Sequence, residues 1–215
     1  MRTFPIKRAH LGLLAGVAVV FAWSAIRPYD YFTWFLEVLP AVLGIGFVAA
    51  IYHRFRLTDL AYVLIAIHAV ILIVGGHYTY AEVPLFHRIQ DVFHQSRNNY
   101  DKVGHFAQGF VPAILVREVL LRTSPLRPGK WLFSLVVLVC LGLSAFYEFI
   151  EWWVALATGS SAEAFLGTQG YVWDTQSDML YCFVGSILSL VLLTRLHDRH
   201  LATLPRGDGQ RSGSG

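Results

Sequence analysis

The chain has 215 residues, of which 55% are hydrophobic and 14% are charged, and its formal net charge is +3. Soluble domains usually carry about 25% charged residues, so this composition, with a mean hydropathy of +0.52, excludes an ordinary soluble domain and indicates a membrane protein. The basic residues follow the loops instead of gathering on one face, which argues against nucleic acid as a partner.

Six apolar segments are long enough to cross a hydrocarbon layer of ~30 Å, which takes about 20 helical residues. A backbone in lipid must satisfy its own hydrogen bonds, and period-2 alternation is absent, so helices are predicted and not barrel strands. The predicted fold is all-α, a single transmembrane bundle over residues 1–200, followed by a disordered cytoplasmic tail over residues 201–215. The predicted spans cover approximately residues 9–26, 34–52, 60–76, 103–121, 131–154 and 179–196.

The first segment follows Arg2, Lys7 and Arg8 and has the pattern of a signal peptide. Residues 23–28, which come after it, make a poor small-x-small cleavage site, and five more apolar segments follow. We therefore expect a first helix that is retained in the mature protein.

The distribution of charge predicts the orientation in the membrane. With six spans, both termini share one side with the loops at residues 53–59 and 122–130. That side holds 13 basic and 4 acidic residues, and the other side holds 4 basic and 10 acidic residues. Basic residues concentrate on the cytoplasmic side of membrane proteins, so both termini are predicted to be cytoplasmic.

Three pairs of ionisable residues fall near the outer ends of three predicted spans. A spacing of three or four residues puts each pair on one helix face, and the topology puts all three pairs at one membrane surface. Ionisable groups within spans are costly, so they point to function, most sharply at Glu148. His77 follows the third span on the same side. The pairs are Asp101 with His105, Glu148 with Glu151, and Asp174 with Asp178.

Several chemistries fit these residues. Paired carboxylates can divide acid and base roles, which makes catalytic candidates of Glu148, Asp174 and Asp178. Histidine with carboxylates can also bind a divalent metal, for which the ligands would be His105, Glu148 and Asp178. Asp101 could instead be a hydrogen-bonded partner that orients His105. The sequence has no HExxH motif, cysteine cluster or P-loop. The candidate binding residues are His77, Asp101 and Glu151.

A structural interpretation stands beside the functional one. Lys102 or Arg97 could pair with the carboxylates and lock the helices together. The segment between the third and fourth spans, up to Lys102, is predicted to be a long loop, which is often functional.

Other polar residues are weaker candidates. We expect Glu37 to snorkel outward, His68 to be a satisfied interior histidine, and Arg117 and Glu118 to lie at the interface. Close helix packing is expected at Gly104, Gly109 and Gly142.

Four runs of sequence resemble the YjdF family of bacterial inner-membrane proteins, and the resemblance covers nearly the whole chain. It implies a multi-pass protein of the bacterial inner membrane and supports the choice of site residues, but it names no reaction. The runs are His77–Pro84, Tyr100–Phe110, Tyr147–Trp153 and Phe165–Met179.

A looser similarity is to VanZ-like proteins, which are linked to glycopeptide tolerance at the cell envelope. The shared features are an Asp-Lys-x-x-His start to one helix, a later Glu, and an Asp-rich start to the last helix. They fall here on Asp101, Lys102 and His105, on Glu148, and on Asp174 and Asp178.

The leading hypothesis is an envelope enzyme or binder that acts on a lipid or lipid-linked head group at the outer face of the membrane, with membrane lipids as partners. One alternative is a small transporter or ion pathway, which needs polar residues through the membrane depth. Another is an accessory membrane protein whose carboxylates form a structural network between helices.

Overall fold

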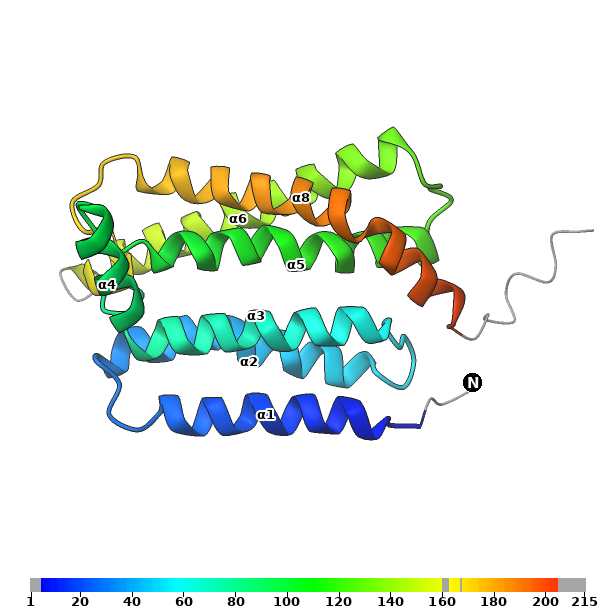
Figure 1. Ribbon diagram of the computed structural model, residues 1–215, viewed down its shortest axis with the longest axis horizontal. Helices are drawn as coiled ribbons and strands as arrows, with labels where there is room; N and C mark the ends of the chain where they lie inside the picture. Colours follow the sequence, from blue (N-terminus) through cyan, green and yellow to red (C-terminus); the bar gives the residue numbers. More distant parts are fainter. Residues whose placement is uncertain (1–4, 160–162, 167, 205–215) are drawn as a thin grey trace, which may run out of the picture.

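A computed structural model describes residues 5–159, 163–166 and 168–204. Every regular element in these residues is a helix, and the long helices lie side by side along one axis (Figure 1). The last helix continues through Ala202, beyond the start of the predicted tail, and residues 205–215 lie outside the described part. The helices are α1 (Arg8–Ser24), α2 (Tyr31–Ile51), α3 (Asp59–His77), α4 (Pro84–Phe93), α5 (Tyr100–Thr123), α6 (Lys130–Thr158), α7 (Glu163–Leu166) and α8 (Asp174–Ala202).

All six predicted spans form helices, and four of these, α2, α3, α6 and α8, are long and apolar enough to cross a membrane. Helix α1 is apolar but has only 17 residues. Helix α5 is not among the four, and it carries charged residues at both ends, including Asp101 in its first turn and Arg122 in its last. Helices α6 and α8 reach 29 residues each and extend beyond the predicted segments, and α8 continues past the charged residues Asp178 and Asp198.

The bundle has two halves of three long helices. In one half, Val38 of α2 packs with Ala69 and Ile73 of α3, and α1 covers them. In the other half, the core between α5, α6 and α8 includes Cys140 and Cys182, both fully buried. Helices α3 and α5 join the halves, so each end of the molecule brings together residues from both (Figure 1).

Helices α5 and α8 approach each other at glycines. A Cβ atom on Gly109 would overlap the backbone carbonyl of Cys182, and a Cβ atom on Gly185 would overlap that of Phe106. A Cβ atom on Gly104 would lie 2.9 Å from the ring of Tyr80. Close packing is therefore confirmed at Gly104 and Gly109.

The prediction is wrong at Gly142, where a Cβ atom would meet nothing within 4 Å. A helical glycine with open space around it is not a packing site, so spacing alone did not separate these cases.

A polar network joins both halves at the end that carries the N-terminus. The carboxylate of Glu118 accepts hydrogen bonds from the backbone and hydroxyl of Thr58, from Arg122 at 2.6 Å and from His197 Nε2 at 3.1 Å. Arg117 donates to His197 Nδ1 at 2.9 Å and to Asp198. Arg117 and Glu118, which were predicted to lie at the interface, are both buried within this network at one end of the bundle.

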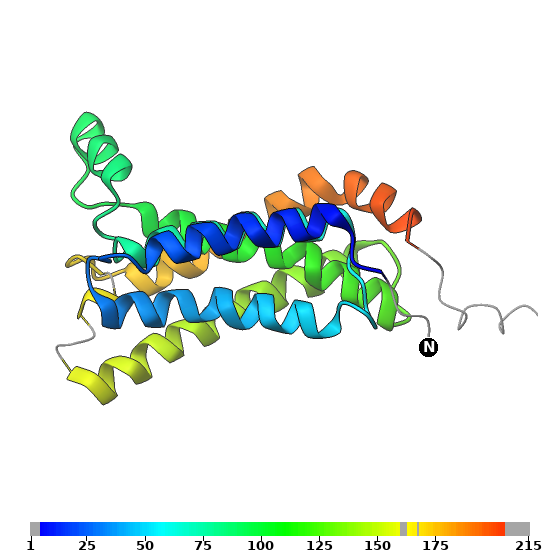
Figure 2. The same ribbon diagram turned by 90° about the horizontal axis from the view of Figure 1, so that it is seen from below.

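The segment after α3 is not a long irregular loop as predicted, because residues 84–93 form α4. Pro84 starts this helix, where a missing backbone N–H breaks no helical hydrogen bond. His94 ends it in the left-handed conformation, with φ of 51°. Helix α4 projects sideways from one end of the bundle (Figure 2).

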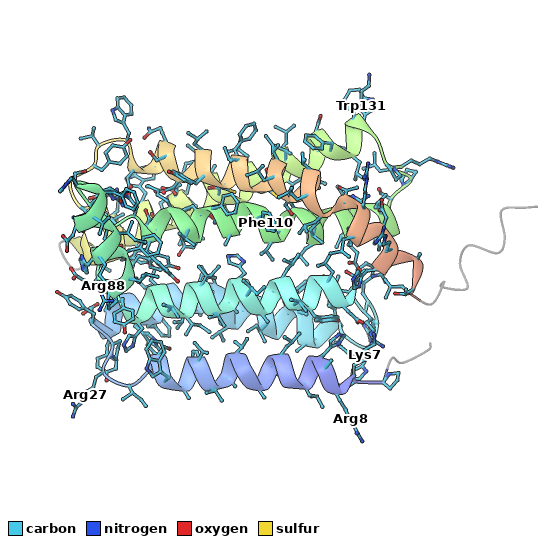
Figure 3. The ribbon with its side chains drawn as sticks, viewed as in Figure 1. Lys7, Arg8, Arg27, Arg88, Phe110 and Trp131 are labelled. Atoms are coloured by element: carbon cyan, nitrogen blue, oxygen red, sulfur yellow. The ribbon has the colours of Figure 1, made fainter. Side chains whose placement is uncertain are left out.

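Labelled side chains mark the two ends of the bundle. Lys7, Arg8 and Trp131 lie at one end, and Arg27 and Arg88 lie at the other (Figure 3). The second end carries α4, α7 and the starts of α5 and α8, and it holds the candidate site.

Candidate functional site

A buried group of aspartates and cations joins α5 to α8. Lys102 Nζ donates to Asp178 at 2.6 Å, to Asp174 at 2.7 Å and to Asp101 at 3.2 Å. Arg97 Nη2 lies 3.2 Å from Asp101 Oδ2, and Arg97 Nη1 donates to Asp174. The predicted pairing of Lys102 and Arg97 with these carboxylates is confirmed.

His105 is adjacent to this ion-paired group. Its Nε2 lies 3.2 Å from Asp101 Oδ1 and 3.7 Å from Asp178 Oδ1. Its Nδ1 lies 3.0 Å from the side-chain oxygen of Gln108. The predicted spacing of four residues therefore does bring Asp101 and His105 together on one face of α5.

The other side of the site is formed by three glutamates, Glu37, Glu148 and Glu151. Glu148 and Glu37 are both only 7% exposed. Glu148 Oε1 is buried and has no hydrogen-bond partner in the described part of the chain, although the side chain also bonds Thr175. Glu37 Oε2 has a long contact of 3.5 Å with the hydroxyl of Tyr147. The ion pairs of Lys102 and Arg97 go to aspartates throughout the described residues, so neither cation neutralises these glutamates.

The two groups face a common cavity of about 90 Å³. Phe165 and Leu166 of α7 line it near the end of the bundle, and His68 lines it from the middle of α3. The charged residues in its wall are Glu37, Asp101, His105, Glu151 and Asp178. A larger groove, about 170 Å³, lies between α1, α2 and α3, but its lining is almost wholly apolar and offers little chemistry.

Tyr80 is set into the cavity wall by an unusual backbone. Thr79 and Tyr80 both have left-handed φ values, 49° and 54°. Such conformations cost about 1–3 kcal/mol in non-glycine residues and tend to occur at functional sites. The absence of a Cβ atom on Gly75 leaves room for the phenol ring. Burial raises the pKa of Tyr80 well above 10, so its hydroxyl keeps its proton.

Two sets of three residues are close enough to share a metal ion, and both include His105. In each set, one ligand atom per residue lies within 4.8 Å of the others. Asp178 already accepts a hydrogen bond from Lys102, so we favour the second set, whose glutamates have no such cation. The sets are Asp101, His105 and Asp178, and His105, Glu148 and Glu151.

The structure thus brings together all the predicted acidic site residues and His105, but it places His77 elsewhere. His77 Nδ1 lies 2.8 Å from the backbone oxygen of Ser24, and its ring packs on Trp23 and Tyr78. The side chain of His77 therefore ties α3 to the end of α1.

Two expectations from the sequence are wrong. Glu37 does not snorkel outward, since it is buried in the cavity wall. His68 is not a satisfied interior histidine, since its Nε2 is buried without a hydrogen-bond partner among the described residues. Each is a lone polar residue in an apolar run, and only the packing of α2 and α3 against α5 shows that they face the site.

Apolar helices of this length, with a buried cluster of charges at one end, define an integral membrane protein. A family model described as "Predicted membrane protein (DUF2238)" matches residues 9–199. The chain is also 46% identical over 185 residues to "Inner membrane protein YjdF" of Escherichia coli (strain K12), which covers 86% of this chain and 88% of that protein. The chain therefore belongs to the DUF2238 family of membrane proteins, and its resemblance to YjdF is confirmed. No solved structure matches it.

Proposed function

We propose that α1, α2, α3, α5, α6 and α8 all cross the bacterial inner membrane, with both termini in the cytoplasm. The excess of basic residues at the end that carries the N-terminus supports this orientation. The candidate site then faces the outer surface. A membrane-impermeant thiol reagent should label Ser96→Cys in intact cells and Pro128→Cys only after permeabilisation. The reverse pattern would refute the orientation.

We further propose that the site binds a divalent cation and uses it on a lipid or lipid-linked head group. The observation that carries this proposal is that some buried carboxylates of the site are ion-paired and others are not. Lys102 and Arg97 form ion pairs with the aspartates, whereas the buried Glu37 and Glu148 have neither of these cations.

Burying an unpaired carboxylate is strongly unfavourable, so each glutamate must hold a proton or meet a positive charge. A cation held by His105, Glu148 and Glu151 would supply that charge at Glu148. A donor set of one imidazole nitrogen and carboxylate oxygens suits ions such as Zn²⁺ and Mn²⁺. The interhelical clamp explains the aspartates, but it leaves these glutamates unexplained.

The position of the cavity favours a head group as substrate. Residues near one end of the bundle, such as Asp101 and Glu151, form part of its wall, and the proposed orientation puts this end at the outer surface. The α7 residues Phe165 and Leu166 offer it an apolar edge. A bound metal ion polarises phosphoryl or carbonyl oxygens and activates water. Arg97 and Lys102 pair with the cavity residues Asp101 and Asp178, and such groups bind phosphate oxygens well.

Metal content tests the proposal directly. The wild-type protein, purified in detergent and dialysed against Zn²⁺ or Mn²⁺, should carry about one ion per chain by elemental mass spectrometry. Glu151→Gln and His105→Ala should lower occupancy at least about tenfold, since even outer partners of a metal ligand change affinity by 10–100-fold. Asp174→Asn is the matched control, because Asp174 belongs to neither ligand set. Equal metal content in all four proteins would contradict this site.

One observation favours a second candidate function, a proton pathway. His68 lies in mid-helix and lines the same cavity as Glu37, so ionisable groups continue from the site toward the membrane interior. Proton flux into reconstituted vesicles that His68→Leu abolishes would support this function. Equal flux with wild type and variant would exclude it.

A further inference from the structure

Helix α4 has two chemically distinct faces. At 100° per residue its apolar side chains fall within one arc and its polar side chains within the opposite one. The apolar residues are Leu85, Phe86, Ile89, Val92 and Phe93, and the polar residues are His87, Arg88, Gln90 and Asp91.

The apolar face of α4 has few contacts within the chain. No residue of the helix is buried, and Leu85, Val92 and Phe93 are 63%, 70% and 69% exposed. Phe86 is the member of the apolar arc that does pack inward, with its ring 5.2 Å from that of Tyr100. This contact fixes the start of the helix. Ile89 is half-buried, and Leu85, Val92 and Phe93 stay exposed.

The orientation of α4 indicates what covers this face. The helix lies across the long axis of the bundle, at the level where the long helices end, in both views (Figures 1 and 2). Exposed aromatic residues such as Tyr31 and Trp173 occur at the same end of the bundle, as in the aromatic belts of membrane interfaces. A helix in this position runs parallel to the membrane surface.

We propose that α4 lies in the membrane surface, with Leu85, Ile89, Val92 and Phe93 inserted at the boundary between head groups and acyl chains. Amphipathic helices bind in this way, with the apolar face about 5–10 Å deep. A second copy of the chain fits less well. Stable interfaces bury more than about 1,000 Å², which is far more than one face of a ten-residue helix provides.

This placement links the membrane surface to the candidate site. Arg97 and Asn98 follow α4 closely, and both are buried. Arg97 binds Asp174, and Asn98 exchanges hydrogen bonds with the side chain of Gln169. A helix held in the lipid surface therefore fixes the start of the segment that forms one wall of the ion-paired group.

Fluorescence quenching by lipid tests the proposal. Val92→Cys, on the apolar face, and Asp91→Cys, on the polar face, would carry the same thiol-reactive fluorophore in phosphatidylcholine vesicles with or without brominated acyl chains. The wild-type protein is the blank, because Cys140 and Cys182 are buried. Brominated chains should lower emission from position 92 by about twofold or more, with little change at position 91.

Two outcomes would overturn the proposal. Equal quenching at both positions would mean that the apolar face has no preference for lipid. Protection of position 92 from aqueous iodide without quenching by brominated chains would mean that protein covers this face, as in a dimer or a complex.

Discussion

Removal of the Lys102 ammonium should destabilise the protein strongly. In the Lys102→Met variant, Asp101, Asp174 and Asp178 lose a donor that lies 2.6–3.2 Å from each of them. The side chains are buried, with 5–13% exposure for the aspartates. Methionine keeps most of the aliphatic volume of lysine, so the change mainly removes the charge.

The magnitude follows from burial. Breaking a buried ion pair by removing one partner costs about 3–5 kcal/mol, because the remaining charge stays buried and unpaired. For a chain of this size about 1 kcal/mol shifts the melting temperature by roughly 2–4 °C, so Lys102→Met should lower it by roughly 6–20 °C. An exposed pair is worth about 0–1 kcal/mol.

Thermal unfolding in detergent, followed by circular dichroism, measures the effect. Lys7→Met is the matched control, because Lys7 pairs with Asp59 at 2.6 Å and both side chains are 46% exposed. The double variant Lys102→Met/Asp178→Asn should recover part of the loss. If Lys102→Met melts within about 2 °C of Lys7→Met, the ion-paired group does not hold α5 against α8, and the reasoning fails.

Three further predictions use the same unfolding assay. Gly109→Ala should destabilise the protein by about 3 kcal/mol or more, because its Cβ atom meets backbone that cannot move aside. Gly142→Ala, in open space, should stabilise it by about 0.5–1 kcal/mol. Equal effects of the two substitutions would contradict the close approach of α5 and α8. Glu118→Gln should cost about 3–5 kcal/mol, since it removes the charge that faces Arg122 and His197, and a loss below about 1 kcal/mol would show that the network adds little. Glu37→Gln in a chelating buffer should leave the melting temperature unchanged or higher, because it removes a buried carboxylate that has no ion pair in the described residues. A large decrease in melting temperature would place Glu37 in the structural clamp.

Much of the fold could be predicted because the membrane imposes a simple pattern. Runs of about 20 apolar residues located all six long helices. Several of these helices extend beyond the predicted segments, and α5, for example, already includes Asp101 and Lys102 in its first turn. Helix α4 was missed because ten residues of mixed polarity cannot be separated from a loop by hydropathy, although Pro84 and the spacing of Leu85, Ile89 and Val92 did carry its signal.

The site residues could be predicted only where they lie close to each other in the sequence or at the ends of predicted spans. Spacing of three or four residues correctly paired Asp101 with His105, and the order of spans correctly brought three helix ends together. Residues that act alone in an apolar run gave no such signal. Glu37 and His68 join the cavity through the packing of α2 and α3, and His197 meets Glu118 across 79 positions of sequence. Such contacts are set by tertiary structure.

The structural and functional interpretations of the carboxylates need not compete, because the structure separates the residues to which each applies. Asp174 and Asp178 share Lys102, and Asp174 also pairs with Arg97, so a clamp between α5 and α8 accounts for them without any ligand. Glu37 and Glu148 are equally buried but gain no cation from the same group. Helix packing alone gives no reason to keep acids there, since apolar residues would serve it better. The clamp thus accounts for the aspartates, and the glutamates beside His105 are the residues for which we propose a proton or a bound cation as the counter-charge.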